Sequence, residues 1–286
     1  YEVGFIIAPR LNAMGRLEHA IESLRLLCTK DVKRAESLAR HLSKTNLERQ
    51  KVVDEVVLHA LRQTQGKPQT GVIIVSHESY HEGVIGLAAS ALVEEFYRPA
   101  IVLSKKGEVS KASARSISGF NIIETIRKVE GFLLDGGGHP MAAGFSIETT
   151  KIEEFTTKLK EVSTPLLTQD ILTKKLKIDL ELYFNQLSWD LVQAIKSFDP
   201  TGLGNPTPTF ATQGVKILDS RVVGRDGKHL KLKLEKDGAT FEAIAFGMGE
   251  AQTNMSSDRP VDIAYNLEED TWNGNKSLQL KIRDLK

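Results

Sequence analysis

The chain has 286 residues, of which 41% are hydrophobic and 26% charged, and its 38 Lys and Arg residues nearly balance 37 Asp and Glu residues to give a net charge of +1. These values are typical of a folded globular protein of two domains and exclude a disordered or fibrous chain. The balanced charge also excludes a field over the whole molecule that attracts nucleic acid, so any anion site must be local.

The chain opens with YEVGFIIA, an apolar pattern without an initiator Met, which indicates a fragment of a longer protein. No segment has the apolar length of a transmembrane helix or the layout of a signal peptide, so we expect a cytoplasmic location and no membrane partner. The one cysteine, Cys28, cannot form a disulfide within the chain. We expect it to be a buried structural thiol in a reducing compartment.

The segment PRLNAMGR, at residues 9–16, brings three polar side chains close to a glycine. Arg10, Asn12 and Arg16 carry donors that suit a phosphodiester, but the same residues suit a solvated turn. The local signal is weak, and both interpretations stay open.

Apolar residues recur at helical spacing from Asp31 to about Gln63, and neither Gly nor Pro interrupts them. This pattern predicts a long amphipathic helix that connects two domains. A kinked pair of helices is the alternative, because the segment is longer than a typical globular helix.

Between residues 71 and 163, apolar runs typical of buried strands alternate with helical patterns, which indicates an α/β domain. A glycine-rich turn is expected before the last strand. The expected strands are 71–76, 100–104, 108–116 and 143–147, and the expected helices are 83–96, 122–129 and 152–162.

Within this domain, His81 precedes a helix whose first turn contains Gly83 and Gly86. A helix N-terminus that follows a strand is a natural anion site, because its free N–H groups and the helix dipole favour negative charge. A lone histidine is more often structural, so His81 proves little by itself.

The expected strand 108–116 alternates strictly, so Lys111, Ser113 and Arg115 project from one face while small residues occupy the other. Arg offers a planar fork of donors, Lys a point charge and Ser a short hydrogen bond, a combination that suits a phosphate. A solvated strand face explains this segment alone more simply.

Three consecutive glycines, Gly136, Gly137 and Gly138, are followed directly by His139. Such a run favours an unusual bend or the close approach of a ligand, and successive N–H groups in a turn can form an anion nest. His139 is placed to donate a hydrogen bond to a phosphate or to assist proton transfer. A tight loop with a surface histidine is the alternative, and here we prefer the functional interpretation.

From Lys174 onward, short alternating strands predict a small antiparallel barrel, of which the OB-fold is the commonest form that binds nucleic acid. A β-sandwich is the alternative. The expected strands are 176–182, 213–223, 229–234, 241–247, 261–266 and 278–284, and one helix is expected at 187–198.

Two of these strands carry basic residues on one face, opposite leucines. Such faces can follow the backbone of a single strand while an aromatic side chain stacks on a base, although charged outer faces are common in any barrel. The basic and polar residues are His229, Lys231 and Lys233 on one strand and Gln279, Lys281 and Arg283 on the other, with Tyr265 or Trp272 as stacking candidates. No Asp and His residues occur at metal-ligand spacing, so no metal site is predicted in this chain.

Five segments occur together in the order and approximate spacing of the RecJ family: PRLNAMGR, HEGVIGLAAS, SARSISGFN, GGGHPMAAGFS and GLGNPTPTF. The chain resembles these 5′-to-3′ single-strand exonucleases of the DHH phosphoesterase superfamily over nearly its whole length. GGGH followed by A-A-G resembles the DHHA1 domain of that superfamily, and GNPTPTF before a barrel is more particular to RecJ.

The resemblance implies an α/β DHHA1-type domain preceded by a long connector helix and followed by a mostly β OB-like barrel domain. The implied parts are the end of a DHH domain at 1–29, the connector helix at 30–66, the DHHA1 domain at 67–165 and the OB-like single-strand-binding domain at 174–286.

The resemblance also implies roles for individual residues. Ser113 and Arg115 match the segment that binds the 5′-terminal phosphate in the family, and His139 matches a contact to the substrate phosphate that faces the metals. Two Mn²⁺ or Mg²⁺ ions are expected in the parent enzyme, held by a DHH domain upstream, and none in this fragment. The OB-like domain is expected to guide single-stranded DNA toward the cleft.

The implied function is the substrate-binding part of a single-stranded-DNA exonuclease in DNA repair and recombination, a fragment that binds DNA with a 5′ phosphate but does not cleave it. By the same resemblance, partners are single-strand-binding protein and a helicase. One alternative is a DHH–DHHA1 phosphodiesterase of short oligonucleotides or cyclic dinucleotides. Another is a non-catalytic single-strand-binding replication scaffold, and the metal ligands upstream distinguish it from the nuclease.

Overall fold

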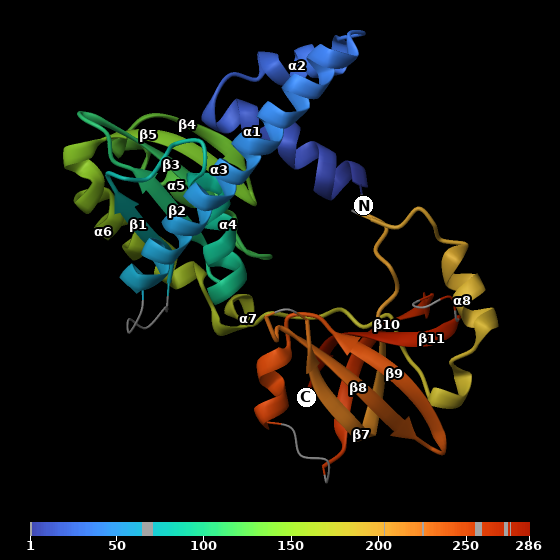
Figure 1. The fold of residues 1–286 in the computed structure, drawn as a ribbon. Helices are drawn as coiled ribbons and strands as arrows, with labels where there is room; N and C mark the ends of the chain where they lie inside the picture. The colour runs from blue at the N-terminus through green and yellow to red at the C-terminus, as the bar shows by residue number, and fades with distance from the viewer. Residues whose placement is uncertain are drawn as a thin grey trace. The chain divides into compact units, whose positions relative to one another are not determined.

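The computed structural model describes residues 2–64, 71–202, 204–224, 226–254, 259–271, 274 and 276–286. The chain divides into two units, residues 1–174 and 175–286, which are described separately (Figure 1). Within the described ranges, no helix is both long and apolar enough to cross a membrane.

The first unit begins with helices. A π-helical segment, η1 (Glu2–Ile7), leads into α1 (Ala8–Leu17), α2 (Ile21–Cys28) and α3 (Val32–Thr64). The last of these is a single helix of 33 residues, so the prediction of one long helix is confirmed and the kinked pair is wrong. The expectation of a buried Cys28 is also wrong: the thiol is exposed, because α2 ends there on a side that the rest of the unit does not cover.

A five-stranded sheet follows, in the order β1-β2-β3-β5-β4, with β1 and β2 parallel and the other neighbours antiparallel. The expected alternation of strands and helices is therefore confirmed. The strands are β1 (Ile73–His77), β2 (Ala100–Ser104), β3 (Val109–Arg115), β4 (Leu133–His139) and β5 (Ala142–Glu148), and the helices are α4 (Ile85–Phe96), α5 (Ile122–Arg127), α6 (Ile152–Ser163) and α7 (Gln169–Leu172), with 3-10 turns η2 (Glu130–Phe132), η3 (Thr149–Lys151) and η4 (Thr164–Leu166).

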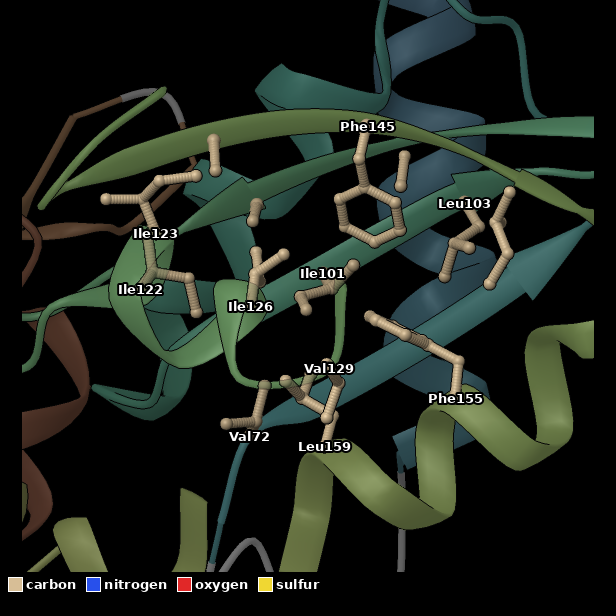
Figure 2. Close-up of a cluster of buried hydrophobic side chains, with 14 of the residues drawn as sticks. Val72, Ile101, Leu103, Ile122, Ile123, Ile126, Val129, Phe145, Phe155 and Leu159 are labelled. Carbon is tan, nitrogen blue, oxygen red and sulfur yellow. The ribbon is translucent and has the colours of Figure 1, made fainter. Parts of the chain in front are cut away.

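Successive side chains of the strands point in opposite directions, so β1 and β2 contribute to a hydrophobic core on each face of the sheet. On one face, Ile101 and Leu103 pack with residues of α5 and α6, and Figure 2 shows their side chains converging with Phe145 and Phe155. The rings of Phe145 and Phe155 lie 5.1 Å apart, centroid to centroid. On the other face, residues of β1 and β2 pack against α4 and the second half of α3.

The glycine triplet does not form the expected turn. It lies in β4, an edge strand, where Gly136 pairs with Phe145, Gly137 with Gly144 and Gly138 with Ala143 of β5. The small residues of β5 let a glycine strand lie close against it. A Cβ atom on Gly138 would come within 2.3 Å of the Ala142 carbonyl oxygen, so close packing against β5 explains this glycine.

The second unit is a closed five-stranded barrel, in which β7-β8-β9-β11-β10 follow one another and β10 pairs with β7. This strand order is that of an OB-fold, and the β-sandwich alternative is wrong. The strands are β7 (Phe210–Val223), β8 (His229–Lys236), β9 (Ala239–Ala245), β10 (Val261–Asp270) and β11 (Ser277–Leu285), and they are accompanied by η5 (Phe184–Gln186), α8 (Trp189–Lys196) and η6 (Gly249–Asn254).

Two details of the barrel differ from the sequence prediction. The barrel is not wholly antiparallel, because β9 and β11 run parallel to each other. The strand expected at 176–182 is reduced to the two residues of β6 (Leu180–Glu181), whose pairing with the start of β7 is parallel. Sequence alternation indicates strands but carries no information on their relative direction.

The packing of β4 against β5 predicts different effects for two neighbouring glycines. Gly138→Ala should destabilise the fold by about 1–3 kcal/mol, because the new methyl group overlaps the backbone of β5. Gly137→Ala is the matched control: nothing lies within 4 Å of its Cβ position, so its free energy of unfolding should stay within about 0.5 kcal/mol of wild type. Urea unfolding followed by circular dichroism measures both. Equal stability of the two variants would contradict this account of the triplet.

Candidate anion-binding site

A cavity of about 660 Å³ lies in the first unit, where three distant parts of the sequence meet. These parts are the end of α1, the segment that leads into α4, and the strand β3 with the turn before it. Its polar and glycine lining residues are Gly15, Arg16, Glu18, His81, Glu82, Gly83, Gly86, Lys106, Lys111, Ser113 and Arg115.

Strand β3 supplies Lys111, Ser113 and Arg115 to this cavity. The predicted alternation is confirmed, since the intervening residues Ala112 and Ala114 are buried in the core on the opposite face. The Arg115 guanidinium donates from Nη1 to the Ser113 hydroxyl at 3.2 Å and to the Ala114 carbonyl at 2.8 Å. These bonds hold the guanidinium beside the serine hydroxyl, so both groups can contact one anion.

The start of α4 lies unusually close to these side chains. A Cβ atom on Gly86 would be 3.0 Å from both the Ser113 hydroxyl and an Arg115 nitrogen, and one on Gly83 would be 1.9 Å from the Arg16 carbonyl oxygen. Gly86 lies in the first turn of α4 as expected, whereas Gly83 precedes the helix. No side chain caps this N-terminus, so the helix dipole adds partial positive charge at the edge of the cavity.

Arg16 and Arg115 line the cavity, and Arg49 on α3 is close enough to Arg16 to feel its charge. Burial and, second, the charge of Arg16 lower the pKa of Arg115, and the same two causes lower the pKa of Arg49 on α3. Arg16 itself donates from Nη1 to the Gly83 carbonyl at 3.1 Å. Within the part of the chain that the structure describes, none of the three arginines forms an ion pair.

The acidic residues that line the cavity have other partners. Glu18 accepts hydrogen bonds from Thr45 at 2.8 Å and from the His41 ring at 3.0 Å, and Glu82 lies 3.9 Å from the Lys106 ammonium. The arginine cluster therefore lacks a carboxylate of its own. A partly buried group of like charges is unfavourable until an anion joins it.

Arg49 was not recognised from the sequence, nor was its neighbour Asn46. Asn46 is only 5% exposed, and both its Oδ1 atom and the Arg49 Nε atom are buried without a hydrogen-bond partner. A signal was present: residues 42, 46, 49, 53, 56 and 60 follow helical spacing, and the polar Asn46 and Arg49 interrupt an otherwise apolar stripe. Polar residues at such positions indicate a site.

His81 lies at the cavity with its ring held by the backbone. Its Nδ1 atom accepts a hydrogen bond from the Gly83 N–H at 3.0 Å, so a neutral ring carries its proton on Nε2. That nitrogen is available to donate to an anion. The structure thus brings His81 together with Arg16, Lys111, Ser113 and Arg115 from the predicted set.

Other predicted residues lie outside the cavity. The segment with Arg10 and Asn12 is helix α1 and not a turn; the Arg10 guanidinium bonds the Ile6 carbonyl and Asn12 is exposed. His139 is exposed at the end of β4, where it pairs with Ala142, which in turn pairs with Arg115. Residues paired in this way share one face of a sheet, so His139 and Arg115 face the same side, roughly 10 Å apart at two strand spacings.

The barrel residues belong to the second unit. Lys231 lies 3.4 Å from the Glu242 carboxylate, whereas Lys233 is exposed. The expectation that Tyr265 stacks on a base is wrong, because its ring is 0% exposed, its hydroxyl bonds Thr212 at 3.0 Å, and burial raises its pKa to about 12. The other candidate, Trp272, lies outside the described residues.

The described residues contain no group of three or more His, Cys, Asp or Glu side chains that could hold a metal ion. The side chains gathered at the cavity are cationic donors, which suit an anion and repel a divalent cation. No step of metal chemistry is therefore assigned to this cavity.

The arginine cluster predicts that removing one of its charges weakens anion binding without lowering the stability of the free protein. Arg49→Met removes one of the repelling charges, so the melting temperature without phosphate should equal or exceed that of wild type. Inorganic phosphate should then raise the melting temperature of this variant by less than it raises that of wild type, because a ligand that binds more weakly stabilises the folded state less. Arg62→Met, at an exposed position of the same helix, is the control and should respond like wild type. An undiminished response of Arg49→Met to phosphate would contradict a role for Arg49.

Known proteins resemble this chain over its whole length. The family model of the DHHA1 domain matches residues 69–164, and that of the RecJ OB domain matches residues 178–284. The chain is 34% identical over 287 residues to the single-stranded-DNA-specific exonuclease RecJ of Bacillus subtilis, which covers 99% of this chain and 36% of that protein. The Haemophilus influenzae protein of the same name is 31% identical to this chain, which covers 51% of that protein's length.

The fold gives the same result. A crystal structure of RecJ from Thermus thermophilus in complex with Mn²⁺ superimposes with a TM-score of 0.85 at 28% identity, covering 100% of this chain and 41% of that one. The chain thus spans between about a third and a half of the length of the relatives it matches. With a DHHA1 domain and a RecJ OB domain in the same order as in these relatives, the chain belongs to the RecJ family.

Proposed function

We propose that this chain is the substrate-holding part of a 5′-to-3′ single-stranded-DNA exonuclease, and that its cavity binds the 5′-terminal phosphate of the DNA. The observation that carries the proposal is the cavity lined by Arg16 and by Arg115 with its bonded Ser113, close to Arg49, where none of the three arginines has an ion-pair partner among the described residues. A terminal phosphate carries more negative charge than an internal phosphodiester. Such a cluster therefore favours a strand end over the middle of a strand.

Each residue of the cavity has a distinct part in this proposal. Arg115 offers two parallel N–H donors to the phosphate oxygens, and the Ser113 hydroxyl, 3.2 Å from its Nη1 atom, offers a third. The uncapped start of α4 adds its dipole, and His81 adds a donor at Nε2. Lys111 supplies charge at the mouth of the cavity, where it is exposed.

His139 is proposed to contact a phosphate further along the strand. It faces the same side of the sheet as Arg115, with the small Ala142 between them, so nothing bulky on β5 separates the two positions. The edge strand β4 is exposed at Gly137, where nothing lies within 4 Å of the Cβ position, and this leaves room for the DNA backbone beside His139. In this proposal the glycine segment has two roles: Gly138 lets β4 pack closely against β5, and Gly137 leaves space for the DNA backbone.

Hydrolysis is proposed to take place on metal ions held elsewhere in a longer protein. The related Thermus structures are complexes with Mn²⁺ and Mg²⁺, and such ions activate water and stabilise the leaving oxygen. We propose that this chain alone binds DNA without cleaving it, and that it contributes position rather than chemistry. A place in DNA repair and recombination, with single-strand-binding protein and a helicase as partners, rests on family membership alone.

The role of Arg115 can be tested in a longer RecJ-family enzyme that contains this chain. Arg115→Ala should lose most of the discrimination between 5′-phosphate and 5′-hydroxyl ends, and Arg115→Lys should restore only part of it because an ammonium lacks the bidentate fork. The measurement is the ratio of degradation rates on the two substrates. General unfolding would lower both rates and leave the ratio unchanged.

Arg127→Ala, at an exposed position on α5 of the same unit, is the matched control and should keep the wild-type ratio. If a folded Arg115→Ala enzyme also keeps the ratio, Arg115 does not bind the terminal phosphate, and the proposed role of the cavity is wrong.

A further inference from the structure

We propose that Phe246 is a platform on which a base of single-stranded DNA stacks, and that the cations around it hold the neighbouring phosphates. This inference rests on the proposed function, since it names a contact of the second unit with the same strand. It replaces Tyr265, the aromatic candidate from the sequence that is buried in the structure.

Phe246 follows β9 directly and is 54% exposed. Its ring meets the His229 ring edge to face, with centroids 5.1 Å apart and an interplanar angle of 74°. The His229 ring is itself held, because its Nδ1 atom accepts a hydrogen bond from the Gly247 N–H at 3.1 Å. The phenylalanine is therefore supported from the side while much of its surface stays open.

Basic side chains share the outer face of the barrel with this ring. Strand alternation places His229 on the outer face of β8, and Lys281 and Arg283 on the outer face of β11. The Lys281 ammonium lies 5.8 Å from the centroid of the Phe246 ring, and Arg283 is exposed and forms no ion pair among the described residues.

Two carboxylates of this face form ion pairs with its lysines, and one of these lysines is Lys281. Glu242 is the partner of Lys231 at 3.4 Å, and Glu268 is the partner of Lys281 at 3.3 Å. Along β9, Glu242 is four residues from Phe246, whereas Arg283, two residues after Lys281 on β11, has no ion-pair partner among the described residues. The strand faces that the sequence predicts to be basic thus carry charges of both signs. The part of them best suited to bind nucleic acid lies around Phe246 and not at Lys231.

An open aromatic ring next to cations suits a single strand better than other partners. Every base has a flat π-face, so stacking on Phe246 tolerates any sequence, while Lys281 and Arg283 can contact phosphates on either side. A protein partner would need a wider apolar patch than one ring surrounded by charge. A duplex keeps its bases stacked on each other and offers none to the ring.

The test compares Phe246→Leu with wild type in the 286-residue chain, with binding to a fluorescent single-stranded oligonucleotide measured by anisotropy. Leucine keeps apolar bulk but cannot stack, so affinity should fall by about tenfold, the effect of losing one stacked base. The salt dependence should stay unchanged, because it reports phosphate contacts. Phe198→Leu is the matched control: this phenylalanine of the same unit is 56% exposed and should tolerate the change without loss of affinity.

A second oligonucleotide, in which abasic sites replace the bases, isolates stacking. Wild type and Phe246→Leu should bind it equally, because no base is present to stack. If Phe246→Leu binds the normal oligonucleotide as tightly as wild type, or loses as much affinity for the abasic one, the stacking platform is wrong while the proposed function stands. If wild type binds neither oligonucleotide, the proposed function fails together with this inference.

Discussion

The repulsion among Arg16, Arg49 and Arg115 is the constraint on which the arrangement of the first unit depends. Two helices, α1 and α3, and strand β3 must be positioned precisely to hold these guanidiniums close together, and burial lowers the pKa of two of them. The glycines at positions 83 and 86 allow the necessary approach of α4, because a side chain there would overlap Arg16 or press on Arg115. Repulsion among these charges does not stabilise the fold. Binding of an anion therefore explains their presence better than stability does.

The two units divide the proposed work by the kind of interaction each offers. In this proposal the concentrated positive charge and fixed donors of the cavity recognise a strand end, and the open ring of Phe246 on the mixed outer face of the barrel holds a strand without reading its sequence. Arg49, which is close enough to Arg16 to feel its charge, has a buried Nε donor without a partner among the described residues. A donor of this kind is consistent with a site that completes its hydrogen bonds on binding an anion.

Much of this could be predicted from the sequence, and the failures have physical causes. Alternation in β3 gave the correct face for Lys111, Ser113 and Arg115, because period-two patterning depends only on local geometry. Arg49 was missed since its partners come from distant segments, although its place in an apolar stripe was visible. The glycine triplet was assigned to a turn because glycine is usual there, yet close packing against β5 explains Gly138 as a strand residue. Tyr265 was assigned to the surface because burial on the inner face of a closed barrel depends on strand register, which the sequence does not show.

The central claim, that the arginine cluster binds the phosphate at a strand end, is tested most directly by a crystal structure of this chain with a short 5′-phosphorylated oligonucleotide. The account predicts electron density for the terminal phosphate within hydrogen-bond distance of the Arg115 guanidinium and the Ser113 hydroxyl, with Arg16 and Arg49 turned toward it. Density for that phosphate beside His139 or on the barrel, with no anion between the arginines, would contradict the account.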